Sequence, residues 1–224
     1  MKRPLRMAAL AAALAGSALL QACFPLAATA LVGGTLMAAD RRTAATQAVD
    51  AEIEFKSGPI LRDALGGRGH VNVNSFDREV LLTGEVPNEE DKQRAEQAAM
   101  QVVNVRSVIN ELGVMGDSSF TSRSNDALIS TKVKASLVDA KDIFASTIKV
   151  TTERGVVYLQ GIVTQREADR AADIASRVSG VERVVKVFHI ISEDELKRMG
   201  SGDTATPPYT TPPAAPKAPA SAPA

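Results

Sequence analysis

The feature that most constrains the fold of this chain is an internal repeat. The segment Val80–Val86 (VLLTGEV) aligns with Val157–Val163 (VYLQGIV), which lies 77 residues later. Flanking positions align at an offset of 76, as Ile53 does with Ile129, so one small gap reconciles the two offsets. We therefore expect two copies of one structural unit of about 70 residues.

Each copy shows the same order of expected elements. In the second copy, Ile129, Val133 and Leu137 recur every fourth position, which is the spacing of one helix face, and Ser124 offers a cap before them. The order is helix, strand, strand, helix, strand. In the first copy we expect a helix over 48–65, strands over 71–74 and 79–86, a helix from 88 and a strand over 105–112. In the second copy we expect a helix over 125–138, strands over 148–152 and 156–163, a helix from 164 and a strand over 181–191.

This order predicts an α+β fold of two tandem αββαβ domains, each an open three-stranded sheet with two helices packed on one face. The C-terminal tail is rich in Pro and Ala and lacks the large apolar residues that would offset the entropy of ordering it. The expected organisation is a signal peptide over 1–22, a lipidated cysteine and tether over 23–46, a first domain over 47–115, a linker over 116–123, a second domain over 124–192 and a disordered tail over 193–224.

The N-terminal region has the order of a secretory signal peptide. Lys2, Arg3 and Arg6 precede an uncharged run over residues 7–20, and the small residue Ala22 stands directly before Cys23. The run is shorter than the roughly 20 residues that a membrane-spanning helix needs. We therefore expect this region to be removed after export.

Cys23 is the expected lipidation site. The sequence Leu20-Gln21-Ala22-Cys23 resembles the bacterial lipobox, in which the cysteine thiol receives a diacylglycerol and becomes the mature N-terminus. Cys23 is also the only cysteine, so the chain has no intrachain disulfide. By resemblance to lipoprotein sorting, Phe24 rather than Asp after the cysteine implies a lipid-anchored protein of the outer membrane that faces the periplasm.

A single long transmembrane helix is the alternative, because residues 24–39 are also largely apolar. Pro25 and the Gly33-Gly34 pair interrupt that run, and helices tolerate these residues poorly in their interiors. Acyl chains add about 0.8 kcal/mol per buried methylene, so a multiply acylated cysteine holds a protein firmly. These observations favour the lipoprotein.

Residues suited to catalysis or metal binding are sparse. His70 and His189 are the only histidines and occupy non-equivalent positions of the two copies, whereas a metal site needs several ligands at set spacing. The sequence has no Gly-x-Ser-x-Gly motif, and the glycine-rich run over 66–69 follows a helix, as a C-cap does. We expect a non-enzymatic protein with no catalytic residue, metal or cofactor.

The two copies differ in net charge. Residues 47–115 carry a net charge of −5, whereas residues 124–192 carry +2. Without residues 1–22 the chain has 23 basic and 26 acidic residues, so it lacks the basic excess of nucleic-acid binders, and no nucleic acid is expected. Anionic phospholipid attracts basic residues, which makes the second copy the better candidate for lipid head groups.

The chain resembles the BON-domain family. The resemblance rests on the αββαβ order, on an apolar strand with a central glycine (Gly84 and Gly161) and on the Val-x-Gly-Val pattern of residues 178–181. The first copy departs from the pattern, because Asn104 stands where the second has Gly180. The resemblance implies phospholipid binding at a membrane surface, support of outer-membrane integrity and a link to cell division.

The first helix of the second copy is the expected lipid-binding element. It combines lysines with an apolar stripe, as a peripheral helix does when it dips into a head-group layer. The same stripe also fits a buried helix face, and lysines also fit a solvated face. Together with the family resemblance, the pattern predicts lipid contacts from Leu128, Ile129, Lys132, Val133, Lys134 and Leu137.

Two functions remain open at this point. The first is a module that binds an anionic phospholipid membrane through the second domain and supports outer-membrane integrity and cell division. The second is a periplasmic adaptor that uses an exposed sheet face or edge to hold envelope-assembly or peptidoglycan-remodelling proteins. One protein could carry out both.

Replacement of Cys23 by Ala tests the anchor. The chain has no other thiol to accept a diacylglycerol, so the Cys23→Ala protein should take up no labelled palmitate and should be soluble or uncleaved. Metabolic labelling of wild type and variant in the same bacterial host measures this. Labelled palmitate on the variant would contradict the lipoprotein interpretation.

Overall fold

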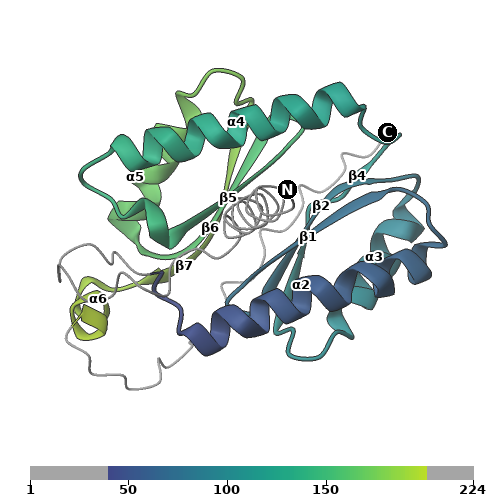
Figure 1. Cartoon of the computed structure of the whole chain (residues 1–224), viewed down its shortest axis with the longest axis horizontal. Helices are drawn as coiled ribbons and strands as arrows, with labels where there is room; N and C mark the ends of the chain where they lie inside the picture. Colours follow the sequence, from purple (N-terminus) through teal and green to yellow (C-terminus); the bar gives the residue numbers. More distant parts are fainter. Residues whose placement is uncertain (1–39, 201–224) are drawn as a thin grey trace, which may run out of the picture. The chain divides into compact units, whose positions relative to one another are not determined.

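The computed structural model describes residues 40–200. The expected signal peptide, Cys23 and most of the tether and tail lie outside these residues. Two domains follow one another along the described chain (Figure 1). The first domain consists of α2 (Ala44–Leu65), β1 (His70–Phe76), β2 (Glu79–Val86), α3 (Glu89–Met100), β3 (Ser107–Asn110) and β4 (Gly113–Val114).

The second domain repeats this order, with a short 3-10 helix before its first strand and a single last strand, β7, in place of β3 and β4. The expected αββαβ order and the α+β fold class are therefore confirmed. A helix outside the repeat, α6 (Glu193–Gly200), follows the second domain. The elements of the second domain are α4 (Phe120–Asp139), η2 (Ala145–Thr147), β5 (Ile148–Glu153), β6 (Val156–Thr164), α5 (Gln165–Ser176) and β7 (Arg183–Ile191).

Each sheet is mixed, and the second strand of each domain lies at its centre. In the first sheet β2 pairs antiparallel with β1 and parallel with β3 and β4. In the second sheet β6 pairs antiparallel with β5 and parallel with β7. The parallel pairing requires a crossover connection, which α3 and α5 provide. Figure 1 shows α2 and α3 on one face of the first sheet, and α4 and α5 on one face of the second.

The core of each domain lies between its sheet and its helices. Val157, Leu159 and Val163 occupy alternate positions of β6 and are fully buried. Small residues of α5, such as Ala171 and Ala175, let this helix pack closely against them. The equivalent cluster of the first domain contains Ile53, Leu61, Leu65, Val80, Leu82, Val86, Ala95, Ala98, Ala99, Val102 and Leu112.

The central strands are buried on the side away from the helices as well. Leu81 of β2 forms one apolar cluster with Tyr158 of β6 and Val187 of β7. The sequence of β6, VVYLQGIVT, shows little alternation of polar and apolar residues, which is typical of a strand buried on both faces. These central strands therefore do not present an exposed sheet face, which is one of the two surfaces that the adaptor hypothesis named; the other is a sheet edge.

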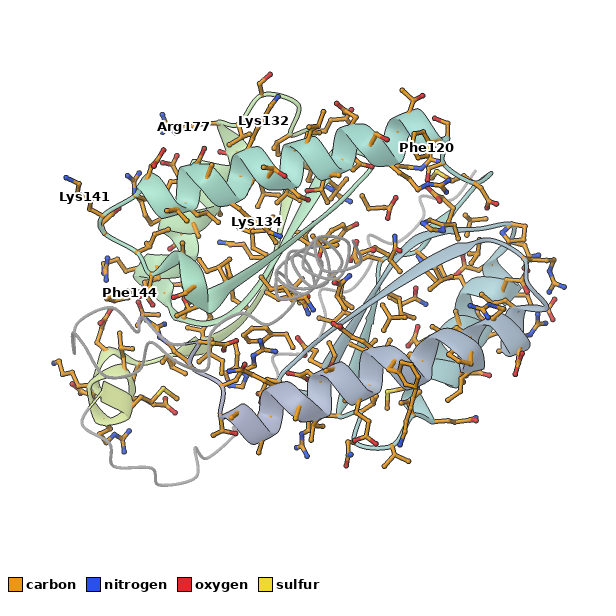
Figure 2. The ribbon with its side chains drawn as sticks, in the orientation of Figure 1. Phe120, Lys132, Lys134, Lys141, Phe144 and Arg177 are labelled. Atoms are coloured by element: carbon orange, nitrogen blue, oxygen red, sulfur yellow. The ribbon has the colours of Figure 1, made fainter. Side chains whose placement is uncertain are left out.

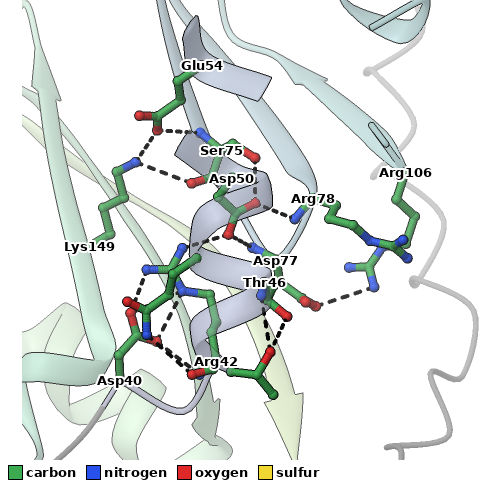
Figure 3. Close-up of polar contacts among 12 residues, drawn as sticks. Asp40, Arg42, Thr46, Asp50, Glu54, Ser75, Asp77, Arg78, Arg106 and Lys149 are labelled. Atoms are coloured by element: carbon green, nitrogen blue, oxygen red, sulfur yellow. Dashed lines mark hydrogen bonds and ion pairs between the residues drawn. The ribbon is translucent and has the colours of Figure 1, made fainter. Parts of the chain in front are cut away.

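Charged side chains also join the two domains. Arg154 donates a hydrogen bond to the fully buried Glu85, and the Lys149 ammonium donates to Glu54 (Figure 3). Asn72 donates to Glu153 at 2.8 Å. Burial raises the pKa of the Glu153 carboxyl, and the hydrogen bond from Asn72 opposes that rise. The contact between the domains thus combines apolar burial with charge-assisted hydrogen bonds.

A buried carboxylate ties α2 to the turn between β1 and β2. Asp50 accepts hydrogen bonds from the backbone N–H groups of Asp77 and Arg78, at 2.8 and 2.7 Å, and from the Ser75 hydroxyl at 2.7 Å (Figure 3). Asp77 and Arg78 have φ angles of 52° and 63°, the left-handed conformation required at both centres of a type I′ turn. The Arg42 guanidinium adds a further donor to Asp50 at 2.7 Å.

Two helices begin earlier than the sequence pattern predicts. α2 starts at Ala44, inside the expected tether, because the Thr43 side chain accepts a hydrogen bond from the Thr46 backbone and caps it. α4 starts at Phe120, and its N-cap is Ser119. Ser124 is therefore an interior helix residue rather than a cap, and α4 occupies part of the expected linker.

Helix α6 corrects the expectation of a disordered segment from residue 193. Its Leu196 and Met199 pack against a cluster of Phe76, Ile162 and Ile191. Three acidic residues occupy its first turn and two basic residues its last, where each sign interacts favourably with the helix dipole. The tail composition that suggested disorder begins only after this helix.

Leu159→Ala tests the assignment of the buried strand face. Leu159 is 0% exposed, so its truncation should cost about 2–5 kcal/mol of unfolding free energy, as cavity-forming changes do. Leu128→Ala removes the same atoms from a residue that is 61% exposed and should change stability by no more than about 0.5 kcal/mol. Urea unfolding measures both. Equal losses would show that the strand face is misassigned.

Candidate lipid-binding surface

The rotation of α4 on its sheet is set by a second buried carboxylate. Asp126 accepts hydrogen bonds from the backbone N–H groups of Arg154 and Gly155, both at 2.9 Å. These residues form the turn between β5 and β6, so Asp126 is the counterpart of Asp50, 76 residues earlier. The carboxylate directs one side of α4 towards the sheet and the opposite side towards solvent.

Three of the residues predicted to contact lipid lie on the inward side. Ile129, Val133 and Leu137 belong to the core cluster of the second domain and are almost fully buried. Their spacing of four positions identified a helix face correctly but could not show whether that face meets the sheet or a membrane. In this structure they do not reach the surface, so the candidate surface keeps Leu128, Lys132 and Lys134 from the predicted set.

The outward side of α4 carries an apolar stripe. Phe120 and Val138 are 79% and 71% exposed. They are 18 residues apart, which corresponds to about five helical turns and places them on one line along the axis. Leu128 is also exposed, and the small residues Ala127, Thr131 and Ala135 on this side are exposed as well. We call this side of α4 the outer stripe.

Lysines flank the outer stripe on both sides. Lys132 and Lys134 are separated by two positions, or about 200° around the helix axis, and Figure 2 shows their side chains leaving α4 in different directions. Both are exposed, as is Lys141 just beyond the helix. None of the three forms an ion pair with an acidic residue in the described part of the chain.

A shallow groove adjoins this surface between α4 and α5. It has a volume of about 610 Å³ and is lined by Lys132, Ser136, Arg170, Asp173, Ile174, Arg177, Val178 and Ser179. Asp173 accepts hydrogen bonds from Arg177 at 2.8 and 3.0 Å and from Arg170 at 3.3 Å. The Arg177 guanidinium lowers the pKa of the Asp173 carboxyl, and the carboxylate in turn raises the pKa of Arg177.

The corresponding helix of the first domain presents a different surface. Its exposed large apolar residues are Phe55, at 82%, and Ile60, at 38%. Lys56 occupies the position equivalent to Lys132 but forms an ion pair with Glu52. On α3, Arg94 forms ion pairs with Glu90 and Asp91. These cations are therefore neutralised by neighbouring acids, unlike the lysines that flank the outer stripe.

The sequence pattern did not predict several residues of this surface. Phe120 was assigned to a linker, because the cap at Ser119 was not recognised. Val138 ended the expected helix and was not placed on its outward side. Arg170 lies on α5 and Arg177 is the C-cap residue of that helix, and only the packing of α4 against α5 brings them to the same groove as Lys132. A helical projection starting at Ser119 would have found the outer stripe, but not the groove.

The histidines do not form part of any recognisable centre. His70 lies on β1 and His189 on β7, in different domains. Across residues 40–200, no group of three or more His, Cys, Asp and Glu side chains is arranged to hold a metal ion. In the same residues no helix has both the length and the apolar content of a bilayer span.

Comparison with known proteins defines the class. The family model of the BON domain matches residues 43–116 and 125–192. These two segments make up more than half of the chain, and they coincide with the two folded repeats. The chain therefore belongs to the BON-domain family, as its sequence pattern indicated.

Three relatives narrow the class further. The chain is 40% identical over 185 residues to the outer membrane lipoprotein DolP of Haemophilus influenzae. The aligned residues cover 80% of this chain and 94% of that protein. It is 32% identical to the 21 kDa hemolysin of Actinobacillus pleuropneumoniae, over 68% of this chain and 79% of that one. It is 35% identical to the osmotically-inducible protein Y of Escherichia coli, over 51% of this chain and 58% of that protein. The protein is thus an outer-membrane lipoprotein with two BON domains that face the periplasm.

Asp126→Ala tests what orients α4. The change leaves the backbone N–H groups of Arg154 and Gly155 without their acceptor, so the unfolding free energy should fall by about 1–3 kcal/mol. Asp139→Ala removes an exposed carboxylate from the same helix and should have little effect. Denaturant titration compares the two. Equal effects would mean that Asp126 does not anchor the helix.

Proposed function

We propose that the outer stripe of α4 binds anionic phospholipid at a membrane surface. The observation that carries the proposal is the combination of exposed apolar side chains with lysines on both flanks that form no ion pair within residues 40–200. An amphipathic helix of this kind lies in the plane of the interface, with apolar side chains in the acyl boundary and cations at the head groups. Through this contact the protein supports outer-membrane integrity and cell division, as the family resemblance implies.

The energetics favour weak, reversible binding. A basic residue near an anionic membrane contributes about 1 kcal/mol, and Lys132 and Lys134 need not break an ion pair to do so. Leu128 and Val138 add apolar burial at about 25 cal/mol per Å² of surface removed from water. One helix with these contacts binds modestly and loses affinity as salt screens the lysines. The acyl anchor at Cys23 compensates by raising the local concentration at the membrane.

The first domain lacks this combination. Its charge is −5 over residues 47–115, which an anionic membrane repels. The equivalent helix α2 carries Lys56 in an ion pair with Glu52 and has only Arg62 as a second cation. These differences support assignment of lipid binding to the second domain.

Charge reversal on α4 tests the proposal. A chain that begins at Ala27 lacks the acyl anchor but retains residues 40–200, which belong to one compact unit. It should bind phosphatidylglycerol vesicles weakly and bind phosphatidylcholine vesicles much less. Lys132→Glu with Lys134→Glu should abolish the binding, because each change replaces attraction by repulsion. Vesicle flotation at low and physiological salt measures both effects.

The matched control reverses the charge of two cations in the first domain by the changes Lys56→Glu and Arg62→Glu. This control should leave vesicle binding nearly unchanged. NMR titration provides an independent measurement on the same protein. Chemical-shift changes over residues 48–65, with residues 125–141 silent, would contradict the assignment to the second domain.

A second candidate function is that of a periplasmic adaptor for envelope-assembly or peptidoglycan-remodelling proteins. One observation favours it for the first domain, whose exposed apolar residues include Ile60, Met100 and Val103. Cross-linking in cells with photoreactive residues at these positions tests this function. Cross-links to periplasmic proteins that persist in the Lys132→Glu, Lys134→Glu protein would show that it is separate from lipid binding.

A further inference from the structure

The groove between α4 and α5 brings three cations from two helices together. Lys132 comes from α4, Arg170 comes from α5, and Arg177 is the C-cap residue of α5. Figure 2 shows Lys132 and Arg177 near one another at the same edge of the domain. The hydroxyl groups of Ser136 and Ser179 line the groove beside apolar Ile174 and Val178. Of the lining residues, only Asp173 is acidic, so the groove carries a positive charge.

Both arginines retain donors that can reach a ligand. Arg177 uses Nε and Nη2 for Asp173, which leaves Nη1 uncommitted within the described residues. Arg170 donates from Nε to Asp142 and from Nη1 to Asp173, which leaves Nη2 without a partner among residues 40–200. Phosphate oxygens accept hydrogen bonds from guanidinium N–H groups of this kind, from an ammonium and from hydroxyls.

The equivalent positions of the first domain lack this chemistry. At an offset of 76 residues, Gln101 replaces Arg177 and Gln97 replaces Asp173. The two serines are also replaced, by the exposed apolar residues Ile60 and Val103. Lys56, the equivalent of Lys132, is held by Glu52. Arg94 is paired with acids, as its equivalent Arg170 is. The scaffold therefore does not require an arginine or serines there, and their presence in the second domain calls for another reason.

The groove also has the right position relative to the outer stripe. Lys132 lines the groove and at the same time flanks the stripe. A phosphate held between Lys132 and Arg177 would therefore lie beside Leu128, one turn earlier on α4. Such an arrangement places a lipid phosphate at the level of the cations and its acyl chains at the stripe.

We propose that this groove is a phosphate subsite for the head group of an anionic phospholipid, with Lys132, Arg170 and Arg177 as the phosphate ligands. The proposal rests on the proposed function and specifies where the head group sits. Asp173 limits the affinity, because it holds both arginines by hydrogen bonds and repels the phosphate. Its removal should free the guanidinium groups and strengthen binding.

The test therefore includes a variant that gains affinity. In the chain from Ala27, Asp173→Asn should bind phosphatidylglycerol vesicles about fivefold more tightly, and Arg177→Gln about fivefold more weakly. Asp169→Asn is the matched control. It makes the same change of net charge on the same helix, but Asp169 pairs with Lys186 and does not line the groove. The affinity of this control should stay within about twofold of wild type.

Equal tightening by Asp173→Asn and Asp169→Asn would overturn the subsite, because net charge alone would explain it. Unchanged binding by both Asp173→Asn and Arg177→Gln would also overturn it. In either case, loss of binding in the Lys132→Glu, Lys134→Glu protein would show that the proposed function itself stands. If the wild-type protein fails to bind phosphatidylglycerol vesicles, both proposals are wrong.

Inorganic phosphate distinguishes the source of the anion. The NMR signal of the Arg177 Nε–H group should shift with phosphatidylglycerol vesicles or short-chain phosphatidylglycerol, and only at much higher concentration with sodium phosphate. A shift with sodium phosphate alone and none with the lipid would assign the groove to a free phosphate and overturn the head-group proposal. No shift with either ligand would overturn it as well.

Discussion

The surface of this protein depends on how one buried carboxylate holds each first helix to a hairpin turn. Asp126 fixes α4 by accepting two backbone hydrogen bonds, as Asp50 fixes α2. A charged group this deeply buried is tolerated because donors satisfy it. Once Asp126 faces inward, the 3.6-residue period places Leu128 and Val138 in solvent and the lysines on the flanks. The candidate lipid surface is thus a consequence of an interaction on the opposite side of the helix.

The same arrangement occurs twice in the chain, and the two copies differ in charge rather than in fold. The buried positions match closely, since the apolar strand faces and the small residues of α3 and α5 occur in both domains. The exposed positions do not match. Within residues 40–200, Lys132 and Lys134 of α4 have no acidic partner, whereas Lys56, the equivalent of Lys132, is paired with Glu52. Core packing restricts buried residues strongly and exposed ones weakly, so surface chemistry can change while the scaffold persists.

The repeat, the element order and the fold class were predictable, because periodicity of 3.6 or 2 and turn residues report directly on local structure. The charge difference between the copies also pointed to the second domain. The prediction failed where one pattern permits two environments. Ile129, Val133 and Leu137 fit a membrane-facing stripe as well as a core face, and burial shows that they form the core. The cap at Ser119 was missed, because Ser124 satisfied the same local rule.

The sequence by itself determined that the chain contains two αββαβ units, since the repeat and the spacing of apolar residues specify this order, and it predicts a lipidated cysteine, Cys23, ahead of them. Only the tertiary structure decided which side of α4 faces outward, that both faces of β6 are buried, and that Arg170 and Arg177 meet Lys132 in one groove. The physical reason is that burial and charge pairing depend on residues far apart in the chain. Their contacts arise only when helices and sheets pack, and no local pattern encodes them.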